Sequence, residues 1–149
     1  MYIYRNNNYF TVDTDTNKSY VNNFFQSATI NGKFHNAVNG PNFASFGNKY
    51  KNFETVKKSF ECSFNALHVR SNKHGMDLSK RGIHDEIQKR VQQGKGFCDF
   101  IISVIENIEK HNYKNIGIFC SAGHHRSVAC VELLKKFVYK NATVIHLNL

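Results

Sequence analysis

The sequence has no tryptophan, a single proline and few acidic residues. Its 20 Lys and Arg side chains outnumber 11 Asp and Glu side chains, so the 149 residues carry a formal net charge of +9. No apolar run approaches the roughly 20 residues that cross a bilayer, and the first residues lack the apolar stretch of a signal peptide. We therefore expect a basic, cytoplasmic protein with no membrane segment. Its positive charge favours an anionic partner such as a phosphate ester or RNA.

Metal and nucleotide motifs are also missing. The four cysteines, Cys62, Cys98, Cys120 and Cys130, do not have the C-x-x-C spacing of zinc sites. No G-x-x-x-x-G-K-[ST] loop for ATP occurs in the chain. We therefore expect neither a metal nor a cofactor, and free thiols because a reducing compartment disfavours structural disulfides. The length excludes a multi-domain enzyme.

The chain divides into two parts of different composition. Residues 1–42 are rich in Asn, Ser and Thr, and the one proline, Pro41, follows an Asn-Gly turn signal. The first 44 residues contain only three basic and two acidic side chains, so most of the positive charge lies further along the chain. We expect a variable Asn-rich N-terminal segment, residues 1–42, and a domain formed by residues 43–149.

The hydrophobic pattern of the second part alternates between strands and helices. Alternating or continuous short apolar runs predict strands, and apolar residues spaced by three or four predict helices. The expected strands are residues 60–69, 115–120 and 142–147. The expected helices lie around 83–91 and over 97–108 and 127–139. This order predicts a single α/β domain with a mainly parallel central sheet flanked by helices.

The segment that follows the expected strand 115–120 has the residues of an anion site. Ligands of parallel sheets bind at the carboxyl ends of strands, and a helix N-terminus favours an anion. Small residues let the backbone approach a ligand, and Arg126 can hold a phosphate through two parallel hydrogen bonds. We therefore predict a phosphate cradle from Cys120 to Ser127. Its candidate binding residues are Ser121, Ala122, Gly123, His125, Arg126 and Ser127.

The same segment allows a catalytic alternative. Cys120 and Arg126 satisfy the C-x5-R pattern, followed by Ser, that resembles the signature of protein tyrosine phosphatases. In that chemistry a cysteine thiolate attacks phosphorus while loop amides and the arginine hold the oxygens. Phe119 stands where those phosphatases usually carry His, and the chain has no Trp for a Trp-Pro-Asp acid loop. A binding module without catalysis is therefore the main interpretation, and a cysteine-dependent phosphatase is the alternative.

Five segments, in order along the second part of the chain, match the motifs of one family. They read S-F-G-N-K-Y from Ser45, N-K-H from Asn72, R-G-I-H-D from Arg81, C-S-A-G-H-H-R-S-V from Cys120 and V-I-H-L-N-L from Val144. They resemble, in this order, the motifs S-F-G-x-K-x-G, N-P-H, L-R-x-x-T-G-L-D, C-x-G-G-x-H-R-S-V and V-x-H-R-D-L of the RapZ C-terminal domain family, the RNase adapter proteins.

The resemblance implies an α/β domain that binds glucosamine-6-phosphate, a phosphorylated amino sugar, and that contributes to RNA binding and to homo-oligomer formation. It implies no catalysis. By position, the loop residues that contact the phosphosugar correspond to Ser121, Gly123, His125 and Arg126.

Three residues outside the loop complete the expected ligand site. His74 matches the upstream ligand-binding histidine of the family, and we expect His74 and His146 to close the pocket. Asn65 replaces the family's aspartate in F-D-V-R, where an amide can still bond to sugar hydroxyls. Phosphate binding should survive this change better than recognition of one particular sugar.

Overall fold

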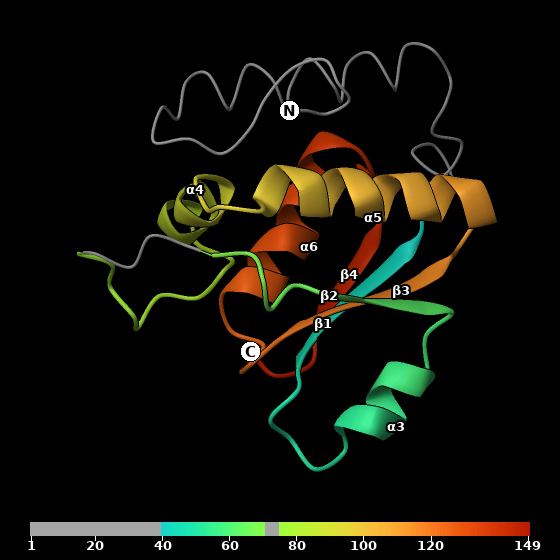
Figure 1. The fold of residues 1–149 in the computed structure, drawn as a ribbon, viewed down its shortest axis with the longest axis horizontal. Coiled ribbons are helices and arrows are strands. Elements are labelled where there is room, and N and C mark those ends of the chain that lie inside the picture. The colour runs from blue at the N-terminus through green and yellow to red at the C-terminus, as the bar shows by residue number, and fades with distance from the viewer. Residues whose placement is uncertain (1–39, 71–74) are drawn as a thin grey trace.

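Strands and helices alternate along the part of the chain that the computed structural model describes, residues 40–70 and 75–149 (Figure 1). In chain order the elements are β1 (Asn42–Gly47), α3 (Phe53–Lys58), β2 (Cys62–Asn65), α4 (Asp85–Gln92), α5 (Phe97–His111), β3 (Asn115–Cys120), α6 (Arg126–Phe137) and β4 (Thr143–His146). This order confirms the α/β fold that the hydrophobic pattern predicts.

The described strands form one parallel sheet in the order β2-β3-β1-β4. The central strands β3 and β1 pair along their whole length, so that Gly47 at the end of β1 lies opposite Cys120 at the end of β3. β2 pairs with β3, and β4 pairs with β1. Because all these strands run in the same direction, their carboxyl ends meet at one edge of the sheet, where α/β proteins bind ligands.

Three helices, α4, α5 and α6, lie on one side of the sheet (Figure 1). The predicted apolar stripe of α5 is buried in the core, and it consists of Phe97, Ile101, Val104, Ile105 and Ile108. These side chains share one hydrophobic cluster with Ile116 and Ile118 of β3. Since fully burying an Ile or Phe side chain contributes about 1.5–3 kcal/mol, this layer is what holds β3 in place.

The short helix α3 lies on the other side of the sheet (Figure 1). Its residue Phe53 packs there in a group of aromatic rings. The ring centroids of Phe53, Phe60 and Phe119 lie 5.5–5.9 Å from that of Phe46 in β1. Aromatic pairs of this kind add about 0.5–1.5 kcal/mol each beyond their burial. The cluster therefore ties the chain that follows β1 to the end of β3.

The hydrophobic pattern predicts neither β1 nor α3. β1 is a central strand that is buried on both faces, and Ser45 within it is 0% exposed, so the strand lacks the alternation of a half-exposed strand. α3 has six residues and none of them is buried, so it has no apolar stripe that a helical period could reveal.

The strand expected over residues 60–69 is shorter in the structure, where β2 ends at Asn65. The Asn65 side-chain oxygen accepts the backbone N–H of Leu67 at 2.8 Å, which is how Asn side chains form turns. Ala66 N–H still donates to the carbonyl of Phe119 at 2.8 Å, after which the chain leaves the sheet. The turn places Leu67 beside the carboxyl end of β3.

Candidate anion-binding site

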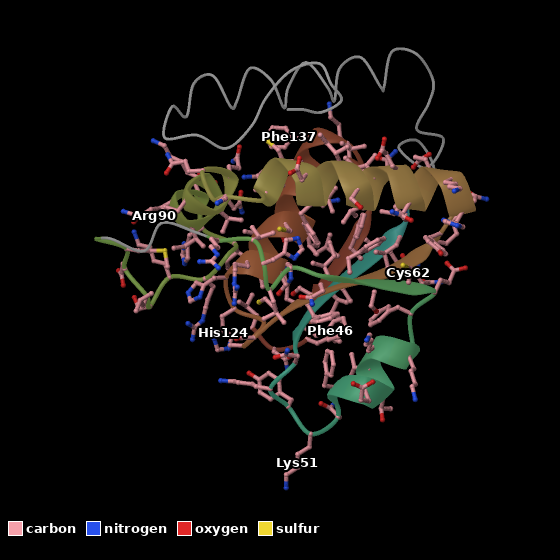
Figure 2. All side chains as sticks on the ribbon, in the orientation of Figure 1. Phe46, Lys51, Cys62, Arg90, His124 and Phe137 are labelled. Atoms are coloured by element: carbon pink, nitrogen blue, oxygen red, sulfur yellow. The ribbon has the colours of Figure 1, made fainter. Side chains whose placement is uncertain are left out.

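Residues 121–125 form the loop that leads from β3 to α6. The chain that leaves β1 is hydrogen-bonded to its beginning, because Asn48 N–H donates to the carbonyl of Cys120 at 2.9 Å and Lys49 N–H to that of Ser121 at 3.2 Å. Figure 2 shows His124 of this loop and Cys62, the first residue of β2, toward opposite ends of the sheet. The loop from Cys120 to Ser127 therefore lies at the carboxyl edge of the sheet.

Two glycines allow the loop to pack against the end of β1. Gly123 has a φ of +73°, in the left-handed region that favours glycine. A Cβ added to Gly47 would lie 2.6–2.8 Å from the backbone of Ser121 and Ala122, closer than side chains approach. The hydroxyl of Tyr50 donates to the carbonyl of Ala122 at 3.1 Å. The loop is therefore held by backbone contacts with the end of β1 and by the Tyr50 hydroxyl.

α6 begins at Arg126, directly after this loop. The side chain of its N-cap residue, His125, makes no capping hydrogen bond, and its first turn contains no acidic residue. The positive end of a helix dipole that is not neutralised by a carboxylate attracts an anion. The helix start therefore favours a negatively charged group beside it.

Cys120 and Ser127 lie beneath the loop rather than on its surface. Cys120 is 3% exposed and Ser127 is 0% exposed. Their side chains are in contact, with 3.2 Å between Sγ and Oγ, and the backbone N–H of Ser127 donates to the sulfur at 3.5 Å. The hydroxyl of Ser127 also lies 3.4 Å from the carbonyl of Phe46. In this arrangement both residues support the loop from below.

Arg126 reaches across the carboxyl end of β3 to the turn after β2. Its Nη1 donates to the carbonyl of Leu67 at 2.6 Å, on the same turn that Asn65 closes. A guanidinium has five N–H donors, so this bond orients the side chain and leaves donors for a phosphate. The structure thus brings Arg126 and Asn65 to the same turn, although 61 positions separate them in the sequence.

His125 is oriented by the loop that precedes α4. Its Nε2 lies 2.8 Å from the carbonyl of Lys80. A carbonyl only accepts hydrogen bonds, so Nε2 is the donor in this contact. The half-buried ring is therefore held at the start of α6.

His146 lies in β4 between β1 and α6, and both of its ring nitrogens have partners. Nδ1 lies 2.7 Å from the hydroxyl of the buried Ser45, and Nε2 lies 2.7 Å from a carboxylate oxygen of Glu132. The chain Ser45–His146–Glu132 joins β1, β4 and α6. A phosphate contact by His146 would require one of these bonds to be exchanged. His74, the other expected histidine, lies outside the described residues.

Asn148, which sequence reasoning did not place at the site, contacts both the end of β1 and His124 of the loop. The side-chain oxygen of Asn148 accepts the backbone N–H of Gly47 at 2.8 Å, and its carbonyl is hydrogen-bonded to the ring of His124. Burial lowers the pKa of His124 below its usual value, and the charges of Arg81, His125 and Lys49 lower it further. Asn148 follows the last strand and belongs to the V-I-H-L-N-L segment. The match of this segment to the family motif was the one feature of the sequence that could have placed Asn148 at the site.

A separate groove of about 390 Å³ lies between α4 and the C-terminal half of α6. Part of its polar lining is paired, since the Lys136 ammonium donates to the side-chain oxygens of Gln88 at 2.6 Å and Asp85 at 3.2 Å. The groove lies away from the carboxyl edge of the sheet, and the loop 121–125 remains the candidate site.

Other kinds of site find little support in residues 40–70 and 75–149. There, no group of three or more His, Cys, Asp or Glu side chains could hold a metal ion. Across the same residues no helix has both the length and the apolar character that a membrane span requires.

Comparison with known proteins identifies the family. No curated protein and no solved structure matches the chain. Residues 78–149, which contain α4, α5, β3, the candidate loop, α6 and β4, match the family described as RapZ C-terminal domain. This match confirms, for residues 78–149, the resemblance to the RapZ C-terminal domain family that the sequence motifs indicated.

Proposed function

We propose that this domain binds a phosphate ester, such as glucosamine-6-phosphate, in the cradle formed by Cys120 to Ser127. The observation that carries the proposal is the placement of Arg126, which is anchored on Leu67 at a helix start whose first turn has no acidic residue. Both groups favour an anion at the same edge of the sheet. Family membership of residues 78–149 adds support for a binding or adapter role.

The loop residues would divide the binding between them. The Arg126 guanidinium holds the phosphate oxygens, and backbone N–H groups at Ala122 and Gly123 contact the ligand where no bulky side chain intervenes. The side chains of Ser121 and His125 are half-buried at the loop and add hydrogen bonds. Buried Ser127 keeps the loop in shape through Cys120.

Residues outside the loop would bind the rest of the ligand. The oxygen of the Asn65 side chain accepts from Leu67, so its NH₂ group is the part that donates to a sugar oxygen. His146 acts through Ser45 and Glu132, by holding β4 beside the site. His74 remains a proposed ligand contact.

Calorimetric titration with glucosamine-6-phosphate, glucosamine and inorganic phosphate tests this function. We expect binding of the two phosphate compounds and none of glucosamine. Arg126→Ala should weaken binding at least about tenfold, the size of a lost charge-assisted hydrogen bond. Arg126→Lys keeps the charge but not the planar guanidinium, so its affinity should lie between those of Arg126→Ala and the parent.

Lys110→Ala provides the matched control, because Lys110 is an exposed basic residue at the far end of α5. Thermal unfolding of each variant shows whether loss of the Leu67 bond has unfolded the protein. Equal affinity of folded Arg126→Ala and the parent for glucosamine-6-phosphate would contradict the proposal.

RNA is a second proposed ligand of the domain. Lys51, Lys57 and Lys58 are exposed on and beside α3, and the Lys57 ammonium lies 5.8 Å from the ring centroid of Phe53. Basic residues interleaved with aromatic rings bind single strands through phosphate contacts and base stacking. Affinity for a short single-stranded RNA should therefore fall steeply with salt concentration, because bound cations are released from the phosphates. Salt-insensitive affinity would exclude this mode of binding.

A further inference from the structure

Asn48, Lys49 and Tyr50 form the short stretch of chain that leaves β1, and we call it the 48–50 segment. Two of its backbone N–H groups donate to the chain that leaves the neighbouring strand β3. Asn48 donates to the carbonyl of Cys120 at 2.9 Å, and Lys49 donates to that of Ser121 at 3.2 Å. Two successive carbonyls therefore point from the start of the loop to the 48–50 segment.

The next carbonyl, that of Ala122, has a side-chain donor in the same segment. The Tyr50 hydroxyl donates to it at 3.1 Å, in a partly buried contact between residues 72 positions apart. The backbone of Tyr50 is itself held at the start of α3, because its carbonyl accepts the N–H of Phe53 at 3.1 Å. Tyr50 thus continues with its hydroxyl the row of donors that the backbone of the two preceding residues begins.

These three bonds determine where the N–H groups of the loop point. In a trans peptide unit the N–H points away from the C=O, and the part of the chain that the structure describes has no cis peptide bond. The N–H groups on the far side of the three peptide units are those of Ser121, Ala122 and Gly123. Within the described residues, none of the three donates to a protein acceptor. The Tyr50 hydroxyl therefore sets the direction of one unpaired donor, the Gly123 N–H.

The unpaired N–H groups and Arg126 lie on the same side of the loop. β3 lies between β1 and β2 in the sheet, so the side that faces away from the 48–50 segment is the side of β2. The guanidinium of Arg126 is anchored there, because its Nη1 donates to the carbonyl of Leu67, just after β2, at 2.6 Å. Successive backbone N–H groups that point to one side bind anions, and an arginine beside them adds charge-assisted donors.

We propose that Tyr50 is a positioning residue of the anion site, whose hydroxyl holds the Ala122 carbonyl and so directs the Gly123 N–H at the bound phosphate. The inference rests on the phosphate-binding function proposed above. Gly123 is the residue of the loop with the greatest backbone freedom, because it has no Cβ and a φ of +73°. Without the hydroxyl, the peptide unit before Gly123 loses the hydrogen bond that orients it. Tyr50 acts through this peptide unit and does not contact the phosphate.

Tyr50→Phe removes the hydroxyl and keeps the ring, so it tests this role in the full chain. Calorimetry with inorganic phosphate should show an affinity about tenfold below that of the parent, as expected when one hydrogen bond to a charged ligand is lost. Tyr113→Phe is the matched control, because it removes a hydroxyl just before Asn115, at the opposite end of β3 from the loop. This control should keep the affinity of the parent, and thermal unfolding verifies that both variants fold.

Amide resonances recorded during the phosphate titration distinguish positioning of one donor from general loosening of the loop. In the parent, phosphate should shift the amides of Ser121 and Gly123 together. In Tyr50→Phe at saturation, the shift of Gly123 should fall below half of its value in the parent. The shift of Ser121 should persist, because its peptide unit is held by the N–H of Asn48.

Three results would refute the positioning role and leave the cradle intact. They are a phosphate affinity of Tyr50→Phe within twofold of the parent, an equal loss of affinity in Tyr113→Phe, and an equal decrease of the Ser121 and Gly123 shifts in Tyr50→Phe. If the parent itself does not bind phosphate, the cradle is refuted and the inference with it.

Discussion

Gly123 meets Gly47 backbone to backbone across the end of the sheet. A Cβ added to Gly123 would lie 2.8 Å from the backbone nitrogen of Gly47 and equally close to the carbonyl carbon of Phe46. The candidate loop and the end of β1 therefore form one packed unit, in which the shape of the cradle depends on two residues that have no side chain.

Replacing Gly123 with Ala should damage both stability and binding. The left-handed φ alone costs about 1–2 kcal/mol for a residue with a Cβ, and the contact with Gly47 adds to this cost. Urea unfolding of Gly75→Ala gives the control, because Gly75 has a similar φ of +68° but, among the described residues, an added Cβ there would meet only the end of the Arg90 side chain at 3.9 Å. Equal losses of unfolding free energy in the two variants would show that the close approach is unimportant.

Replacing Cys120 with Ser separates the binding module from the phosphatase alternative. The introduced hydroxyl would keep a hydrogen-bonding group next to Ser127, so we expect phosphate affinity to change less than about threefold, under one kcal/mol. A colorimetric assay with an aryl phosphate should detect no turnover by the parent. Turnover that the parent shows and the Cys120→Ser variant lacks would establish the enzyme instead.

The lowered pKa of His124 predicts a loss of stability in mild acid. The unfolded chain binds this proton near pH 6.5, whereas burial and the neighbouring positive charges delay protonation in the folded protein. The stability contributed by His124 is therefore complete above about pH 6.5 and is lost as the pH falls through the lowered value. Melting temperatures measured between pH 7.5 and 5 should fall less in His124→Gln than in the parent. Equal decreases in the two proteins would contradict the assignment of this pH dependence to His124.

Replacing His146 with Ala tests whether this histidine supports the fold or contacts the ligand. The variant leaves the buried hydroxyl of Ser45 without its partner, and such a loss costs about 1–3 kcal/mol. We expect this decrease in the free energy of unfolding, together with a nearly unchanged phosphate affinity of the folded variant. A large loss of affinity at unchanged stability would instead place His146 in direct contact with the phosphate.

The hydrophobic pattern predicted the elements in which burial determines the spacing of the apolar residues. The apolar stripe of α5 and the short apolar run of β3 gave nearly correct bounds, because burial on one helix face or inside a sheet imposes a clear residue choice. The loop after β3 was found because small residues, histidines and an arginine follow directly on a buried strand.

Partners that are distant in the sequence were not predictable in the same way. The guanidinium of Arg126 is hydrogen-bonded to the backbone carbonyl of Leu67. Every residue has such a carbonyl, so the sequence does not indicate this partner. Asn148 contacts Gly47, about a hundred positions earlier, through a pairing that only the sheet order creates. The hydrophobic pattern did not predict β1, because it contains the polar Ser45. In the structure this serine is buried and its hydroxyl is hydrogen-bonded to His146.

Nuclear magnetic resonance of the labelled protein, titrated with inorganic phosphate, tests the central claim most directly. The cradle predicts amide shifts that saturate together at residues 121–127, with smaller shifts at Gly47 and Leu67, which contact the loop and Arg126. These shifts should disappear in Arg126→Ala and persist in Lys110→Ala. Saturating shifts that avoid residues 121–127, for example at Gln88 and Lys136 in the groove between α4 and α6, would contradict the account.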